Sequence, residues 1–256
     1  MIETEQLISE TENLWLNKLY LFIEDNFRNS FIPSHDHTHH LRVWNNAKAL
    51  ITSGNFANED FSRDIIESIL FATMLHDSGL TITLSEEHGA ESAKIFNSFC
   101  QSISYHPSCF EKIFEAITIH DDKTYKNCDS QNIISTILNI ADDLDSFGTI
   151  GIFRYAEIYT QRSIDIDKIP YRIIDNITLR WNNFSKTIKP SPLKDEVYRQ
   201  FSAVINFFSS ENKREINYLL DALKLSEGKY KTIADFIELN KTSKSHFIGL
   251  LKLKNR

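Results

Sequence analysis

The chain contains few of the residues that β-sheets and tight turns require. Its 256 residues include only 7 Gly, 5 Pro and three Val. Strands are enriched in β-branched residues such as Val, and the turns that connect them rely on Gly and Pro. This shortage argues against a sandwich, a barrel or a Rossmann sheet, and it predicts an all-α fold.

Membrane-spanning and secretory segments are also missing from the sequence. No run approaches the ~20 apolar residues that span a bilayer, and the start, MIETEQLISE, is acidic where a secretory signal is basic and then apolar. The three cysteines, Cys100, Cys109 and Cys128, form an odd set without CxxC spacing. They indicate free thiols in a reducing compartment. We therefore expect a cytoplasmic protein that does not act at a membrane.

The chain lacks an excess of positive charge. It has 28 Lys+Arg against 35 Asp+Glu, a formal net charge of −7. Proteins that coat DNA or RNA bind phosphates through a basic face, so this class is excluded. The hydrophobic content of 41% excludes a disordered chain, and the length is sufficient for a sizeable core.

Apolar residues recur at helical spacing along most of the chain. The pattern predicts helices over 5–29, 39–51, 61–76, 87–102, 109–120, 131–146 and 150–162, a helical tract from 194 to about 224, and one or two short helices in 229–256. Pro170 marks a break, and Pro190 with Pro192 is the clearest boundary. We expect one domain over 1–190 and a C-terminal helical extension over 191–256 that packs on it.

Eight of the nine histidines fall between positions 35 and 120, and three of these are followed by Asp. The pair His76-Asp77 ends a strongly apolar helix, so it emerges from the core. A buried carboxylate costs several kcal/mol unless it is paired, and imidazole with carboxylate suits zinc, manganese or iron(II). The alternative is a histidine at a helix end with an ordinary capping aspartate.

Two further segments carry the same kinds of side chain. In ILNIADDLDSFG, Asp142 and Asp145 share one face of an apolar helix and repel each other unless a cation or donor lies between them. In SHDHTHHLRVW, His39 and Arg42 lie one turn apart, an arrangement that suits a metal site receiving an anion. The alternatives are a solvated acidic turn and a polar His-rich loop.

Together, His39, His76-Asp77 and Asp142 resemble the signature of the HD superfamily of metal-dependent phosphohydrolases, a helical bundle. HHLRVW is similar to its first motif, LHDSGL to its second, and ADDLDSFGTIGIFR to the last motif of a branch that includes nucleotide pyrophosphatases. The resemblance covers about residues 30–160. It implies that these four residues bind a divalent metal ion (Mn, Zn, Ni, Mg or Fe).

Five other residues are candidates for roles at the same site. Some branches add two histidines and hold a second metal, which here would be His88 and His120. His120 is also a candidate acid for the leaving oxygen. Asp145 is a candidate to orient the attacking water or a metal-bound imidazole, and Arg42 and Arg154 are candidates to hold phosphate.

Two departures from the family motifs limit what the resemblance implies about phosphate binding and substrate class. Ser78-Gly79-Leu80 replaces the Ile-Gly-Lys that often follows the His-Asp pair, so that lysine is missing. The 5′-deoxynucleotidase branch has a Glu at the position of Leu80, which counts against that substrate class.

The sequence thus predicts a hydrolase that uses metal-activated water on a phosphoester or phosphoanhydride. Its partner would be a small phosphate-containing molecule, with a nucleotide as one candidate, and no motif indicates an oligomeric state. One alternative is a di-iron oxygenase of the same fold. Another is a non-catalytic metal- or ligand-binding module, for which the basic tail KTSKSHFIGLLKLKNR is a candidate docking segment.

Overall fold

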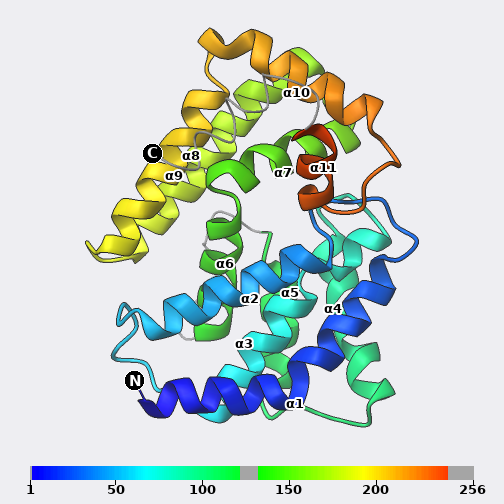
Figure 1. Cartoon of the computed structure of the whole chain (residues 1–256). Coiled ribbons are helices and arrows are strands. Elements are labelled where there is room, and N and C mark those ends of the chain that lie inside the picture. The colour runs from blue at the N-terminus through cyan, green and yellow to red at the C-terminus, as the bar shows by residue number, and fades with distance from the viewer. Residues whose placement is uncertain (1, 122–131, 242–256) are drawn as a thin grey trace. The chain divides into compact units, whose positions relative to one another are not determined.

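The computed structural model describes residues 2–121 and 132–241, and regular structure in these ranges is entirely helical (Figure 1). They contain eleven α-helices, three short 3-10 helices and no strand. The all-α prediction is therefore confirmed. Cys128 and the tail from residue 242, with His246, lie outside the described residues. No described helix combines the length and apolar character needed to cross a bilayer.

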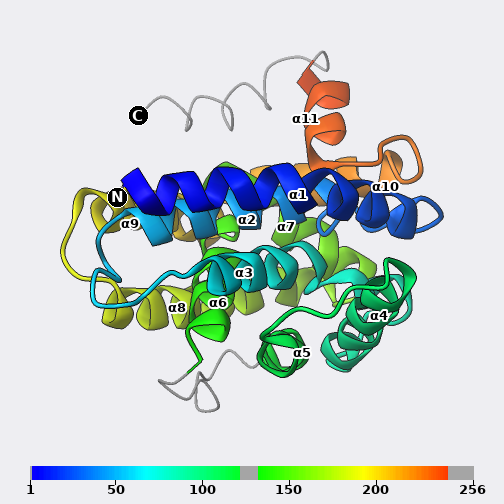
Figure 2. The ribbon, with the colours of Figure 1, turned by 90° about the horizontal axis from the view of Figure 1, so that it is seen from below.

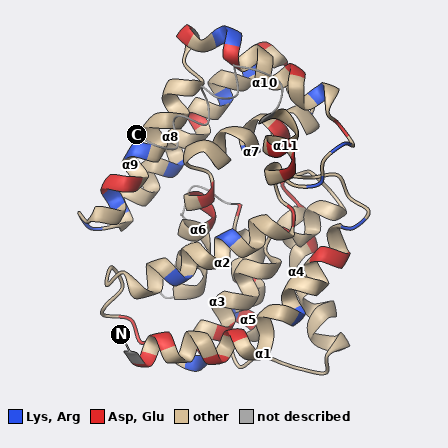
Figure 3. Cartoon of the chain, in the orientation of Figure 1, with Lys and Arg blue, Asp and Glu red and all other residues tan. Residues whose placement is uncertain are grey.

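The chain divides into two compact units. The first consists of Met1–Ser30 and His37–Leu144, and the second of Phe31–Asp36 and Asp145–Arg256. The predicted boundary between residues 190 and 191 lies within the second unit, and the predicted domains at 1–190 and 191–256 stay a prediction. The helices of each unit carry both acidic and basic residues (Figure 3).

The first unit is organised around an apolar helix, α3. Its helices are α1 (Ile2–Phe27), α2 (His37–Thr52), α3 (Arg63–Leu75), α4 (His88–Ser102), α5 (Phe110–Ile119) and α6 (Ile133–Asp145), with a 3-10 turn, η1 (Ser78–Thr81). Every residue of α3 from Ile66 to Leu75 is buried, and α3 packs against α1, α2, α4 and α5. Figure 2 shows α1 and α3 running side by side.

Aromatic packing fixes the middle of α3. Phe71 is fully buried and meets the rings of Trp15, Phe96, Phe99 and Tyr105 at centroid distances of 5.4–6.3 Å. At its start, the Ser62 hydroxyl accepts a hydrogen bond from the backbone N–H of Ile65. The helix is thereby held at both its start and its middle, and its end delivers residues 76 and 77 into the core.

The second unit is built around α7 (Gly148–Gln161), which is buried from Gly151 to Tyr159. It packs against α8 (Ile169–Thr187), α9 (Pro192–Phe207), α10 (Lys213–Leu225) and α11 (Ile233–Lys241). Pro170 and Pro192 stand in the first turns of α8 and α9, where a missing N–H costs nothing.

The helical tract predicted over 194–224 is two helices. A 3-10 turn, η3 (Ser210–Asn212), separates α9 from α10. Asn212 closes this turn by donating its side-chain N–H to the carbonyl of Asn206. Ser and Asn side chains compete for backbone hydrogen bonds in this way, which ends a helix although the apolar spacing continues.

Candidate metal centre

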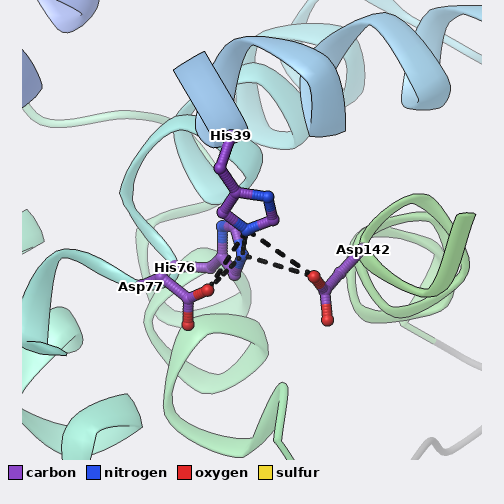
Figure 4. A group of neighbouring side chains, drawn as sticks. All are labelled: His39, His76, Asp77 and Asp142. Atoms are coloured by element: carbon purple, nitrogen blue, oxygen red, sulfur yellow. Dashed lines mark hydrogen bonds and ion pairs between the residues drawn. The ribbon is translucent and has the colours of Figure 1, made fainter. Parts of the chain in front are cut away.

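Three helices of the first unit bring four predicted residues together (Figure 4). His39 lies in α2, His76 and Asp77 directly follow α3, and Asp142 lies in α6. All four are buried, with at most 5% of each residue exposed. One ligand atom from each lies within 4.8 Å of the others. A hydrogen bond of 3.0 Å from the Asn46 side chain on α2 to the Ala141 carbonyl ties α2 to α6 beside Asp142.

The spacing of these four atoms matches a shared ion. His39 Nε2 lies 3.2 Å from both His76 Nε2 and Asp77 Oδ2, and 3.7 Å from Asp142 Oδ1. His76 Nε2 lies 3.1 Å from Asp77 Oδ2 and 4.0 Å from Asp142 Oδ1. Ligands about 2.1 Å from one metal ion are separated by roughly 3.0–4.2 Å, depending on the angle between them.

A second group shares Asp77 with the first. Its other oxygen, Oδ1, lies 2.9 Å from His120 Nε2 and 3.3 Å from His88 Nε2, and the two imidazole nitrogens are 3.2 Å apart. All three residues are buried. The two oxygens of one carboxylate therefore face two different sets of histidines, as a bridging ligand between two adjacent ions does.

Close packing at Gly79 brings His88 to Asp77 across a loop of ten residues. The N–H of Gly79 donates to the Ser92 hydroxyl at 2.8 Å. A Cβ at Gly79 would lie 2.2 Å from the His88 carbonyl oxygen and 2.5 Å from the Ser92 nitrogen. Only glycine lets the turn after Asp77 lie this close to the start of α4.

The orientation of three histidines is set by backbone carbonyls. The Nδ1 atoms of His76, His88 and His120 lie 3.0, 2.8 and 2.6 Å from the carbonyl oxygens of the residues three positions earlier. A carbonyl only accepts, so each Nδ1 carries the hydrogen and donates it. In the neutral ring Nε2 then keeps its lone pair toward the cluster, which is the arrangement of a metal-binding histidine.

The charges of the cluster are mutually dependent. Burial alone would raise the pKa of Asp77, but the imidazoles of His76, His120 and His39 outweigh burial and hold this pKa well below its usual value. Burial alone would lower the pKa of His76, and the carboxylates of Asp77 and Asp142 reverse that effect. Buried nitrogen and oxygen lone pairs concentrated in this way fit a cation. These residues could therefore hold one or two divalent metal ions.

His40 is a buried neighbour of the cluster that the sequence interpretation missed. No role for it was predicted from the sequence, yet it is fully buried. Its ring centroid lies 5.5 Å from that of His39 and 5.1 Å from that of His76. Burial and the two neighbouring imidazoles lower its pKa well below the usual value. Its spacing from Val43, Trp44 and Ala47, which are buried on the same helix face, is the signal that would have identified it.

The other predicted site residues are held by polar contacts. Arg42 donates to the Thr38 hydroxyl at 3.0 Å, one turn earlier on α2. Arg154 and Asp145 form an ion pair of 2.9 Å in the second unit, and both are buried. The roles expected for Arg42, Arg154 and Asp145 stay predictions.

Comparisons with known proteins identify no relative of this chain. No protein-family model, no curated protein and no solved structure matches the chain. The resemblance to the HD superfamily therefore depends on the motifs and on the residues that the fold brings together.

Proposed function

We propose that the protein is a metal-dependent hydrolase of the HD type that cleaves a phosphoester or phosphoanhydride. The observation that supports this most strongly is the buried group His39, His76, Asp77 and Asp142, which lie in the order of the superfamily signature and have ligand atoms within 4.8 Å of one another. Buried carboxylates and imidazoles without a cation would be costly, so the fold has a reason to keep a metal ion there.

The four side chains of the cluster share one task in this proposal, which is to hold the ion. His39 and His76 present Nε2, and Asp77 and Asp142 present carboxylate oxygens, so the four would hold the ion. A divalent ion at such a site supplies activated water at neutral pH and neutralises charge on the phosphoryl oxygens. The two carboxylates leave the site with a negative charge that a cation offsets, and its burial excludes bulk water.

His120 is the candidate to donate a proton to the leaving group. It is buried, its Nδ1 hydrogen is committed to the Ile117 carbonyl, and its Nε2 lies 2.9 Å from Asp77 Oδ1. Burial is the main cause that lowers its pKa below the usual histidine value. The Asp77 carboxylate opposes the effect of burial, so in the one-ion form it would favour a second proton, at Nε2, which His120 would release to the departing oxygen. In a two-ion form the same nitrogen would be a ligand.

The experiment is a screen of the full chain with a matched pair of variants. A generic phosphodiester, nucleoside triphosphates and nucleoside monophosphates are offered with manganese, nickel, magnesium or zinc. Asp77→Ala should lose bound metal and hydrolysis together. Asp64→Asn removes an exposed carboxylate from α3 and should keep both. An Asp77→Ala variant that keeps its metal and its activity would contradict the proposal.

The second group, Asp77 with His88 and His120, favours one other candidate function. Two adjacent ions that share a carboxylate also suit a di-iron oxygenase, which some relatives of the HD fold are. Metal analysis of protein purified without oxygen separates the two candidates. One manganese, zinc or nickel ion per chain favours hydrolysis, and two irons favour oxidation.

A further inference from the structure

A second close backbone approach, besides that at Gly79, lies next to His88. Gly89 follows His88 on α4, and it lies against the end of α5, the helix on which α4 packs. A Cβ at Gly89 would be 2.5 Å from the Thr118 carbonyl oxygen and 3.2 Å from the Ile117 carbonyl oxygen. Ordinary contacts of this kind begin at 3.4 Å, so any side chain here would require the two helices to separate by about 0.9 Å along this contact.

One of the two carbonyls beside Gly89 also orients His120. The Ile117 oxygen accepts the hydrogen of His120 Nδ1 at 2.6 Å. On the other side of the contact, His88 directly precedes Gly89, and its Nε2 lies 3.2 Å from His120 Nε2. The contact between α4 and α5 at Gly89 is therefore adjacent to both imidazoles, and the separation of the two helices at this point sets the separation of the two rings.

The contact at Gly79 fixes His88 relative to Asp77 in the same way. Gly79 follows Asp77 by two residues, and its N–H donates to the hydroxyl of Ser92, one turn after His88 on α4. The two glycines thus bring the start of α4 against two segments, η1 beside Asp77 and the end of α5 beside His120. Glycine has a low helix propensity, so its presence in the first turn of α4 is explained by the close approach and not by helix formation.

We propose that Gly79 and Gly89 are positioning residues, which hold His88 and His120 at the separation that one shared ion needs. Ligands of a metal site have to be held within about 0.5 Å of their working geometry. A displacement of about 0.9 Å between α4 and α5 exceeds that tolerance. The first group of four ligands takes none from α4 or α5, so it should be spared. The proposal rests on the metal centre but not on hydrolysis, and the two can therefore fail separately.

The test is a manganese titration of the chelator-treated full chain, followed by calorimetry and by electron paramagnetic resonance. Wild type should bind two ions per chain, with the exchange-coupled spectrum of two ions that share a carboxylate. Gly89→Ala should bind the first ion as wild type does and the second at least about tenfold more weakly, without the coupled spectrum. Ser92→Ala is a milder change that removes the acceptor of the Gly79 N–H, and it should weaken only the second ion, by about threefold.

Each variant has a matched control that should bind two ions as wild type does. Gly54→Ala strains a turn at φ +75°, but its Cβ meets no atom within 4 Å, so no helix is displaced. Ser98→Ala removes an exposed hydroxyl from α4.

Three results would overturn the proposal. They are a single manganese ion in wild type, an unchanged second ion in both Gly89→Ala and Ser92→Ala, and a folded Gly89→Ala in which both ions are weakened equally. If Gly89→Ala does not fold, Ser92→Ala against Ser98→Ala decides the question. Absence of any bound manganese in wild type would overturn the metal centre as well.

Discussion

Glu157 should make the stability of the protein depend on pH near neutrality. The side chain lies on α7 with 2% of the residue exposed, and burial raises its pKa from 4.5 to about 7 against the opposing effects of Ser34, Gln161 and Arg154. In the unfolded chain the carboxyl ionises near 4.5. Between these two values the folded state retains a proton that the unfolded state has released, so the free energy of unfolding falls as pH rises.

Glu157→Gln removes this dependence, because glutamine resembles the neutral form at every pH. The difference of roughly 2.5 pKa units corresponds to about 3 kcal/mol. Urea unfolding of chelator-treated protein should show the variant gaining about 3 kcal/mol over wild type between about pH 4 and pH 8. The exposed Glu211→Gln is the control for the same chemical change and should show a much smaller trend. If the stability difference between Glu157→Gln and wild type stays constant across this range, the Glu157 carboxyl does not have a raised pKa in the folded protein.

Three further changes test other parts of the structure. Gly79→Ala places a Cβ against the backbone of α4 and should lower the free energy of unfolding by at least about 2 kcal/mol in urea. Asp145→Ala leaves the buried Arg154 charge without this carboxylate and should lower the free energy of unfolding by about 3–5 kcal/mol in the same assay. A decrease below about 1 kcal/mol would contradict this expectation. In a protein that holds two ions, His88→Ala should lower the metal content measured by mass spectrometry to one, whereas the exposed His106→Ala should leave it unchanged.

The sequence predicts the helices of the first unit well because their apolar faces repeat at helical spacing. The helix predicted over 61–76 is α3, Arg63–Leu75, and the helix predicted over 131–146 is α6, Ile133–Asp145. The same periodicity showed that His76-Asp77 follows a buried helix and that Asp142 interrupts another. Candidate ligand residues can therefore be anticipated from the sequence when each interrupts an apolar helical pattern.

Contacts between residues distant in the chain could not be predicted. Arg154 and Ser34 are 120 positions apart, and no local pattern indicates that they bond. Periodicity likewise did not separate α9 from α10, because side-chain hydrogen bonds end α9 while apolar residues continue. His40 was missed because it lies in a His-rich polar segment, although its helix face is apolar.

Metal affinity tests most sharply whether one cation binds among His39, His76, Asp77 and Asp142. Chelator-treated wild type and Asp142→Asn are titrated with manganese in a calorimeter. Wild type should bind at least one ion per chain, and Asp142→Asn should weaken this binding at least about a hundredfold. Equal affinity in the two proteins, or no binding by wild type, would contradict it.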